Sequence, residues 1–151
     1  MRRIADTFLR RWHKMLGLQH QSPPWYRARL QEEQQEVLEA KTYTEKLSET
    51  SDVYFTIIRA KYDGFPIEDL QPFVATRDTP IYAYMLGKYT LRWGFYRTAS
   101  WLCGAPRYWE VSEVVNPTKG WKLRVVAARH LMDPVEFEKV GTRLRWIWPL
   151  L

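Results

Sequence analysis

Two pairs of acidic residues lie close together in the first third of the chain, with a spacing that suits metal binding. Glu33 and Glu36 are three positions apart, and so are Glu49 and Asp52. Because residues three apart share one face of an α-helix, the two acids of each pair would point the same way. A chain reversal near Thr42 would bring all four carboxylates to facing levels of an antiparallel helical hairpin.

Four ionised carboxylates gathered in one place need a counter-charge. Hard oxygen ligands suit Mg²⁺, with Mn²⁺ as the alternative, and such ions take further ligands from water and substrate phosphates. The competing interpretation is a solvated acidic helix face, which is what runs of charge usually form. Here Glu33 adjoins the apolar positions Leu30 and Val37 instead of opposing them, and this favours the metal site.

The same acids resemble the metal motif of the MazG-type all-α nucleoside triphosphate pyrophosphatases, which reads E-E-x-x-E, a variable gap and E-x-x-D. Here the motif is matched by Glu32-Glu33-x-x-Glu36 and Glu49-x-x-Asp52. Further on, Lys88-Tyr89-Thr90-Leu91-Arg92-Trp93 resembles the phosphate-contacting K-F-x-x-R-F segment of that family. The Asn that often precedes this Lys in the family is absent, because Leu86-Gly87 occupy the place. The resemblance covers residues 25–101.

The resemblance implies Mg²⁺-dependent hydrolysis of a nucleoside triphosphate to the monophosphate and pyrophosphate, by a homodimer or homotetramer. In that scheme Glu36 also orients the attacking water, and Lys88 and Arg92 stabilise charge on the phosphates. Glu32 would be an outer or surface acid. The metal ligands that the resemblance assigns are Glu33, Glu36, Glu49 and Asp52.

Three further residues are candidates for substrate contact. Aromatic residues ahead of the motif often help to form the base pocket in this family, so Trp25 or Tyr26 could stack on a base. The alternative is that the two rings only fix the start of their helix. Arg59 lies seven residues after Asp52 on the same helical face and could reach a phosphate, although such a residue is more often a surface charge.

The composition agrees with a globular protein that has an anionic partner. The 151 residues include 46% hydrophobic residues and carry a formal net charge of +6, with a pI near 9.5. A basic balance suits a nucleotide, a nucleic acid or an anionic surface. A second class of function is therefore a catalytically silent helical module that binds nucleic acid or a larger assembly, although a nucleotide substrate is favoured over nucleic acid.

The single Cys103 excludes an intramolecular disulfide framework and indicates a reducing compartment. We expect a cytoplasmic location. The mitochondrial matrix is the alternative, since residues 1–18 are rich in Arg and poor in acids. These residues also fit a helix that packs on the core or touches a membrane surface or nucleic acid. No apolar run reaches the length of a transmembrane helix.

The expected fold is all-α, with a four-helix-bundle-like core and additional terminal helices in a single domain, residues 1–151. An amphipathic helix is predicted within residues 1–20, the MazG-like core at 24–104, and an extension of uncertain structure at 105–151. The helix starts are predicted from capping residues. They are Ser22 before Pro23, Thr42 with Glu45, Thr79 before Pro80, and Asp133 before Pro134.

Other segments have weaker patterns. Residues 65–78 are predicted as a connector with a short helix at 67–71, residues 106–116 as irregular or a short strand, and residues 121–127 as a strand or a helix start. Gly87 and Gly94 lie seven apart inside a predicted helix and indicate close packing by another backbone or a ligand. We interpret His13 and His20 as ordinary surface residues. His130 is interpreted as structural and Cys103 as a small core residue.

Overall fold

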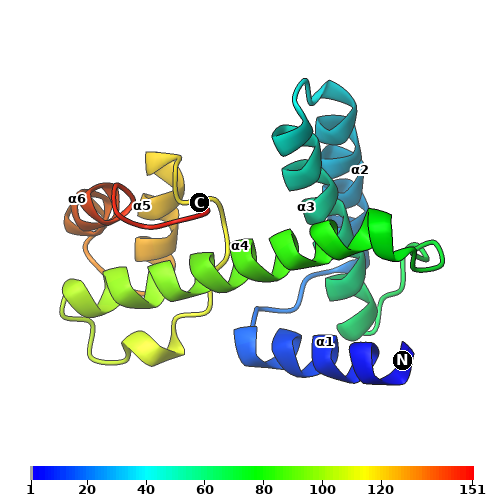
Figure 1. Cartoon of the computed structure of the whole chain (residues 1–151). Helices are drawn as coiled ribbons and strands as arrows, with labels where there is room; N and C mark the ends of the chain where they lie inside the picture. The colour runs from blue at the N-terminus through cyan, green and yellow to red at the C-terminus, as the bar shows by residue number, and fades with distance from the viewer. Residues whose placement is uncertain (1) are drawn as a thin grey trace. The chain divides into compact units, whose positions relative to one another are not determined.

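The computed structural model describes residues 2–151, and every regular element in this range is helical (Figure 1). The elements are α1 (Arg2–Leu16), α2 (Pro23–Glu39), α3 (Tyr43–Tyr62), α4 (Ala75–Leu102), the short 3-10 helix η1 (Tyr108–Glu110), α5 (Gly120–Arg129) and α6 (Pro134–Leu144). The predicted all-α class is confirmed. The MazG-like bundle stays a prediction. Across the described range, no helix combines the length and apolar character that crossing a bilayer requires.

The chain forms two compact units. The first contains residues up to Met15 together with Gln19–Leu86, and the second contains Leu16–Leu18 and Gly87–Leu151. We expected one domain with a core ending at Gly104. That organisation stays a prediction. The boundary between the two compact units lies inside α4.

Local capping chemistry sets three of the helix starts, as predicted. The Ser22 hydroxyl accepts a hydrogen bond from the Trp25 amide at the start of α2. Thr42 and Glu45 form the reciprocal capping box of α3. Asp133 accepts hydrogen bonds from the first amides of α6. Each of these signals needs only residues within three positions of one another, which is why sequence alone predicts them.

The start of α4 was predicted wrongly. The helix begins at Ala75, not Pro80, so Pro80 lies inside it, and the short helix expected at 67–71 does not form. The buried carboxylate of Asp78 explains why the helix starts about one turn earlier than predicted. It accepts hydrogen bonds from the Val74 amide at 2.6 Å and from the Tyr54 hydroxyl at 2.8 Å. Hydrogen bonds from Arg77, with those from Val74 and Tyr54, hold the pKa of Asp78 well below its usual range even though burial opposes this.

Replacing Asp78 by Ala is expected to lower the free energy of unfolding by about 2–3 kcal/mol, because part-buried donors on Val74, Tyr54 and Arg77 would lose their acceptor. Urea denaturation followed by circular dichroism measures this change. The matched control is Asp69→Ala, since Asp69 is an exposed acid of the same connector. Equal stabilities for the two variants would contradict the role given to Asp78.

In the first unit, α1 is attached to α3 by aromatic and charged contacts. The Trp12 and Phe55 rings meet edge to face at 5.9 Å, and the Tyr62 hydroxyl donates a 2.9 Å hydrogen bond to Asp6. His13 is buried, with Nε2 3.6 Å from Asp63 Oδ1, so its prediction as a surface residue was wrong. Its partner lies 50 positions away in the sequence, beyond the reach of local patterns. His20 is exposed, as predicted, and lies 3.6 Å from the same carboxylate.

In the second unit, the core forms where α4, α5 and α6 meet. The Tyr96 and Phe137 rings stack at 6.3 Å, and Leu123 and Val126 of α5 are fully buried in the same cluster. Residues 121–127 are therefore helical, and in residues 106–116 the only regular element is the 3-10 helix η1. Cys103 is half-buried against this core, in line with the prediction.

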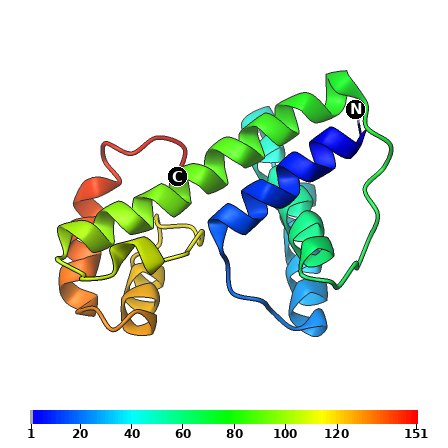
Figure 2. The ribbon, with the colours of Figure 1, turned by 90° about the horizontal axis from the view of Figure 1, so that it is seen from below.

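The two glycines of α4 meet the C-terminal tail, residues 145–151, within the second unit (Figure 2). A Cβ atom on Gly94 would lie 3.4 Å from Trp148 Cζ2, and one on Gly87 would lie 3.4 Å from Leu150 Cδ1. The Trp148 indole N–H donates a 2.8 Å hydrogen bond to the Leu91 carbonyl. Gly87 and Gly94 are therefore packed closely, but by side chains of the tail and not by another backbone as the sequence suggested.

Candidate metal centre

The helical hairpin of α2 and α3 positions the predicted acids. The two helices lie side by side and are joined by the three residues 40–42 (Figure 1). A connection this short forces the helices to run antiparallel, so positions equally distant from the turn face one another. Glu33 lies seven residues before the turn and Glu49 seven residues after it, whereas Glu36 lies one helical turn nearer and Asp52 about one helical turn further away.

Three carboxylates converge in this hairpin. Oxygen atoms of Glu33, Glu36 and Glu49 all lie within 4.8 Å of one another. Glu33 is almost completely buried, with 1% of its surface exposed, whereas Glu36 and Glu49 are half-buried. Asp52 is also buried, and its charge acts on Glu33. The acids that the sequence predicted to meet are therefore brought together, and Asp52 borders the set of three.

The buried position makes Glu33 a weak acid. Desolvation, followed by the negative charges of Asp52 and Glu36, raises the pKa of Glu33 to about 8, although Arg29 opposes the shift. Among the described residues, neither Glu33 oxygen accepts a hydrogen bond. Arg29 meets one of these oxygens as an ion pair. A carboxylate that is buried among like charges in this way would be better satisfied by a divalent cation than by a proton.

Arg29 is a member of the site that the sequence analysis missed. It pairs with Glu33 through one guanidinium nitrogen and with Glu32 Oε2 at 2.8 Å through the other. The signal was present, because Arg29 and Glu33 are four positions apart and share a helix face. Glu32 is exposed and lies outside the carboxylate cluster, which agrees with its prediction as a surface acid.

The residues fit a hard divalent cation. Carboxylate oxygens are the ligands that Mg²⁺ and Mn²⁺ prefer, and no soft ligand is among them. Arg29 offsets one of the acidic charges. Glu33, Glu36 and Glu49 would hold the ion, and Asp52 is a further candidate ligand.

Trp25, Tyr26 and Arg59 also come together, about two helical turns along α2 from Glu33. The Arg59 guanidinium lies 5.2 Å from the Trp25 ring centroid and donates a hydrogen bond to the Gln19 carbonyl. Tyr26 is fully buried and donates to Asp63, which favours a structural role for it. Trp25 keeps 38% of its surface exposed. Substrate contact by these three residues stays a prediction.

Lys88 and Arg92 project from α4 within the second unit. Only 4% and 6% of their surfaces are exposed, so neither side chain is a solvated surface charge. Both cationic groups lie near the Tyr89 ring, at 5.9 Å and 5.7 Å from its centroid. The four acids belong to the first unit. The phosphate-binding roles of Lys88 and Arg92 stay predictions of the resemblance.

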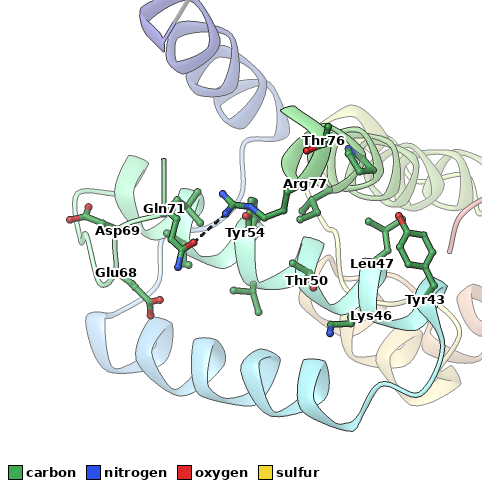
Figure 3. A pocket seen from close by; sticks show the side chains of 15 residues that line it. Tyr43, Lys46, Leu47, Thr50, Tyr54, Glu68, Asp69, Gln71, Thr76 and Arg77 are labelled. Atoms are coloured by element: carbon green, nitrogen blue, oxygen red, sulfur yellow. Dashed lines mark hydrogen bonds between the residues drawn. The ribbon is translucent and has the colours of Figure 1, made fainter. Parts of the chain in front are cut away.

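A separate cavity of about 560 Å³ opens in the first unit between α3, the connector and the start of α4 (Figure 3). Its polar lining includes Lys46, Thr50 and Arg77, and a hydrogen bond joins Arg77 to Gln71 across its edge. None of the four predicted metal ligands lines this cavity. It therefore lies apart from the carboxylate cluster.

The chain matches no family model, no curated protein and no solved structure. What the structure itself shows, over the described residues, is an all-helical protein with a partly buried carboxylate cluster on a helical hairpin. Any more specific assignment rests on the motif residues and the chemistry of that cluster.

Proposed function

We propose that this protein is a Mg²⁺-dependent nucleoside triphosphate pyrophosphohydrolase. The observation that carries the proposal is the convergence of Glu33, Glu36 and Glu49, with Glu33 buried and its pKa raised to about 8. A surface acidic patch needs neither this burial nor this convergence. The spacing of the motif and the Lys88–Trp93 segment support the same function through the resemblance to the MazG-type enzymes.

In this reaction, water attacks the α-phosphorus, the bond from that phosphorus to the α–β bridging oxygen breaks, and pyrophosphate leaves. Bound Mg²⁺ supplies charge neutralisation on the phosphates and lowers the pKa of coordinated water. Glu36, half-buried at the mouth of the cluster, orients the attacking water and accepts its proton. Arg29 holds the Glu33 carboxylate in place. In the scheme that the resemblance implies, Lys88 and Arg92 would stabilise charge on the phosphates.

The experiment is a measurement of pyrophosphate release from a panel of common and modified nucleoside triphosphates, with Mg²⁺ and with a chelator. Glu36→Gln is the test variant. Glu39→Gln is the matched control, since Glu39 is an exposed acid three residues along the same helix. We expect release that requires Mg²⁺, is retained in Glu39→Gln and falls at least 100-fold in Glu36→Gln, as loss of a general base typically costs.

The proposal is wrong if no triphosphate is hydrolysed and Mg²⁺ leaves the melting temperature unchanged. That result would favour the catalytically silent interaction module. Mg²⁺-dependent release that survives in Glu36→Gln would instead remove Glu36 from the reaction. The oligomeric state that the resemblance implies, a homodimer or homotetramer, is measured by light scattering on the same samples.

The double replacement of Lys88 and Arg92 by Met tests the phosphate contacts. Met keeps much of the buried aliphatic volume and removes both charges. We expect kcat/KM to fall by about 100-fold or more, because charge developing on the phosphates would lose two cations. Circular dichroism confirms that the helices persist. Unchanged kinetics in a folded variant would exclude both residues from the active site.

A further inference from the structure

The net positive charge of the protein comes from one of its two units. Residues 87–151 contain 11 of the 23 Lys and Arg residues but only 5 of the 17 Asp and Glu residues. This stretch therefore carries the whole formal charge of +6. It also contains six of the eight Trp residues. The first unit, which holds the carboxylate cluster, has no net formal charge.

Within the second unit, basic and aromatic residues concentrate at one end of a helical hairpin. Helices α5 and α6 pack against each other (Figure 2). Arg124 pairs with Glu138, and a Cβ atom on Gly141 would lie 3.0 Å from Leu123. Arg145 Nη1 donates a 2.7 Å hydrogen bond to the Thr118 carbonyl. These contacts fix an antiparallel register that brings the start of α5 beside the end of α6.

We call this end the hairpin tip and define it by its basic and aromatic side chains. They are Lys119, Trp121, Lys122, Arg143, Arg145 and Trp146. Its two indoles are among the most exposed in the protein, at 63% for Trp121 and 83% for Trp146. Lys119 and Arg143 are exposed as well.

The tip keeps its positive charge because the nearby acids are engaged by other residues. No Asp or Glu occurs in residues 114–132 or 139–151. The Glu138 carboxylate lies beside Gly120 at the tip, where it pairs with Arg124. The buried Glu113 meets Arg129 at 2.6 Å and His130 at 3.0 Å. Asp133 caps α6 near the opposite end of the hairpin.

The tip is also held in one arrangement. The Arg145 hydrogen bond ties the end of α6 to Thr118, and three residues later Trp148 packs over Gly94 and donates a hydrogen bond to the Leu91 carbonyl. Trp146 lies between these two anchors, so its exposed indole is presented by an ordered backbone. Such a preorganised ring loses little conformational entropy when a flat ligand stacks on it.

We propose that the hairpin tip is a binding surface for single-stranded nucleic acid. Exposed indoles stack on bases of any sequence, and neighbouring cations pair with the phosphates. A membrane-binding helix separates an apolar face from a cationic one. Here cations and indoles alternate at intervals of one or two residues, in Lys119-Gly120-Trp121-Lys122 and Arg143-Leu144-Arg145-Trp146. The proposal is independent of the hydrolase activity.

The test is fluorescence anisotropy of a labelled 12-nucleotide single strand, titrated with the full-length protein over a range of salt concentrations. We expect affinity to fall steeply as salt rises. Trp121→Ala and Trp146→Ala should each weaken binding by about 10-fold, in the range typical of one lost stacking contact. Replacing Lys119 and Arg143 by Gln should reduce the slope of log affinity against log salt by about 0.7 for each cation.

Matched controls lie in the same unit but outside the tip. Trp109→Ala removes an indole that is 53% exposed, and Lys139→Gln removes an exposed cation. Both should bind as the wild type does, and so should Glu36→Gln. Three outcomes would overturn the proposal: no binding at low salt, equal losses in tip and control variants, or binding to phosphatidylserine vesicles without binding to the oligonucleotide.

Discussion

Replacing Glu33 by Gln is expected to stabilise the metal-free protein at pH 8 and to abolish its stabilisation by Mg²⁺. In the folded state the pKa of Glu33 is raised to about 8, against an ordinary value of 4.5. At pH values between 4.5 and 8, Glu33 is therefore protonated in the folded state and ionised in the unfolded state. The favourable contribution of Glu33 is fully present below pH 4.5 and is lost as the pH rises through 8. Gln keeps the shape of the neutral acid without this loss.

The expected gain of the metal-free variant over the wild type is about 2–4 kcal/mol in free energy of unfolding at pH 8, and it should shrink towards pH 5. The buried His13, whose pKa is lowered chiefly by desolvation, titrates alike in both proteins and cancels from the comparison. With Mg²⁺ at 100 times its dissociation constant, the wild type should gain about 2.7 kcal/mol and the variant nearly nothing.

Urea denaturation at pH 5, 7 and 8, with and without Mg²⁺, measures both effects. Glu39→Gln on the same helix should show neither of them. An equal response of Glu33→Gln and wild type to Mg²⁺ would remove Glu33 from the metal site. If metal-free Glu33→Gln is less stable than the wild type at pH 8, then burial and the neighbouring negative charges do not destabilise ionised Glu33, and the interpretation is wrong.

Truncating Trp148 to Ala is the second large effect that we expect, with a loss of about 2–4 kcal/mol in free energy of unfolding. The indole meets Phe95 edge to face at 6.0 Å, covers Gly94 and donates to the Leu91 carbonyl. Its removal would leave a void over a glycine, where α4 has no side chain to fill it. Trp148→Phe should lose less, because it keeps a ring but not the hydrogen bond.

Thermal and urea denaturation, together with limited proteolysis of the last residues, measure this effect. The matched control lies two positions earlier, because Trp146 is 83% exposed and its truncation should change stability by less than about 0.5 kcal/mol. Similar stabilities for Trp148→Ala and Trp146→Ala would show that the tail does not contribute to the core.

The features that sequence predicted correctly depend on near neighbours. The caps at Ser22, Thr42 and Asp133 each act over three residues. The meeting of Glu33, Glu36 and Glu49 depends only on helical spacing and on a three-residue turn. A local pattern is sufficient wherever the physical interaction itself is local.

Apart from Arg29, whose partner Glu33 is only four positions away, the features that the sequence analysis missed depend on distant partners. α4 gains a turn because Asp78 receives a hydrogen bond from Tyr54, 24 positions earlier. His13 is buried beside Asp63, 50 positions later. Gly94 indicated close packing but not that Trp148 would provide it. No periodicity links such pairs, so their contacts become visible only in the folded chain.

Because α4 is continuous across the boundary between the two units, the protein cannot be divided there into two intact fragments. The boundary between the units falls between Leu86 and Gly87, inside a helix of 28 residues. A fragment cut there would lose the backbone hydrogen bonds that cross the cut and would begin or end in a frayed turn. Fragments meant to isolate either half should therefore keep the whole of α4, Ala75–Leu102, so that neither begins nor ends inside the helix.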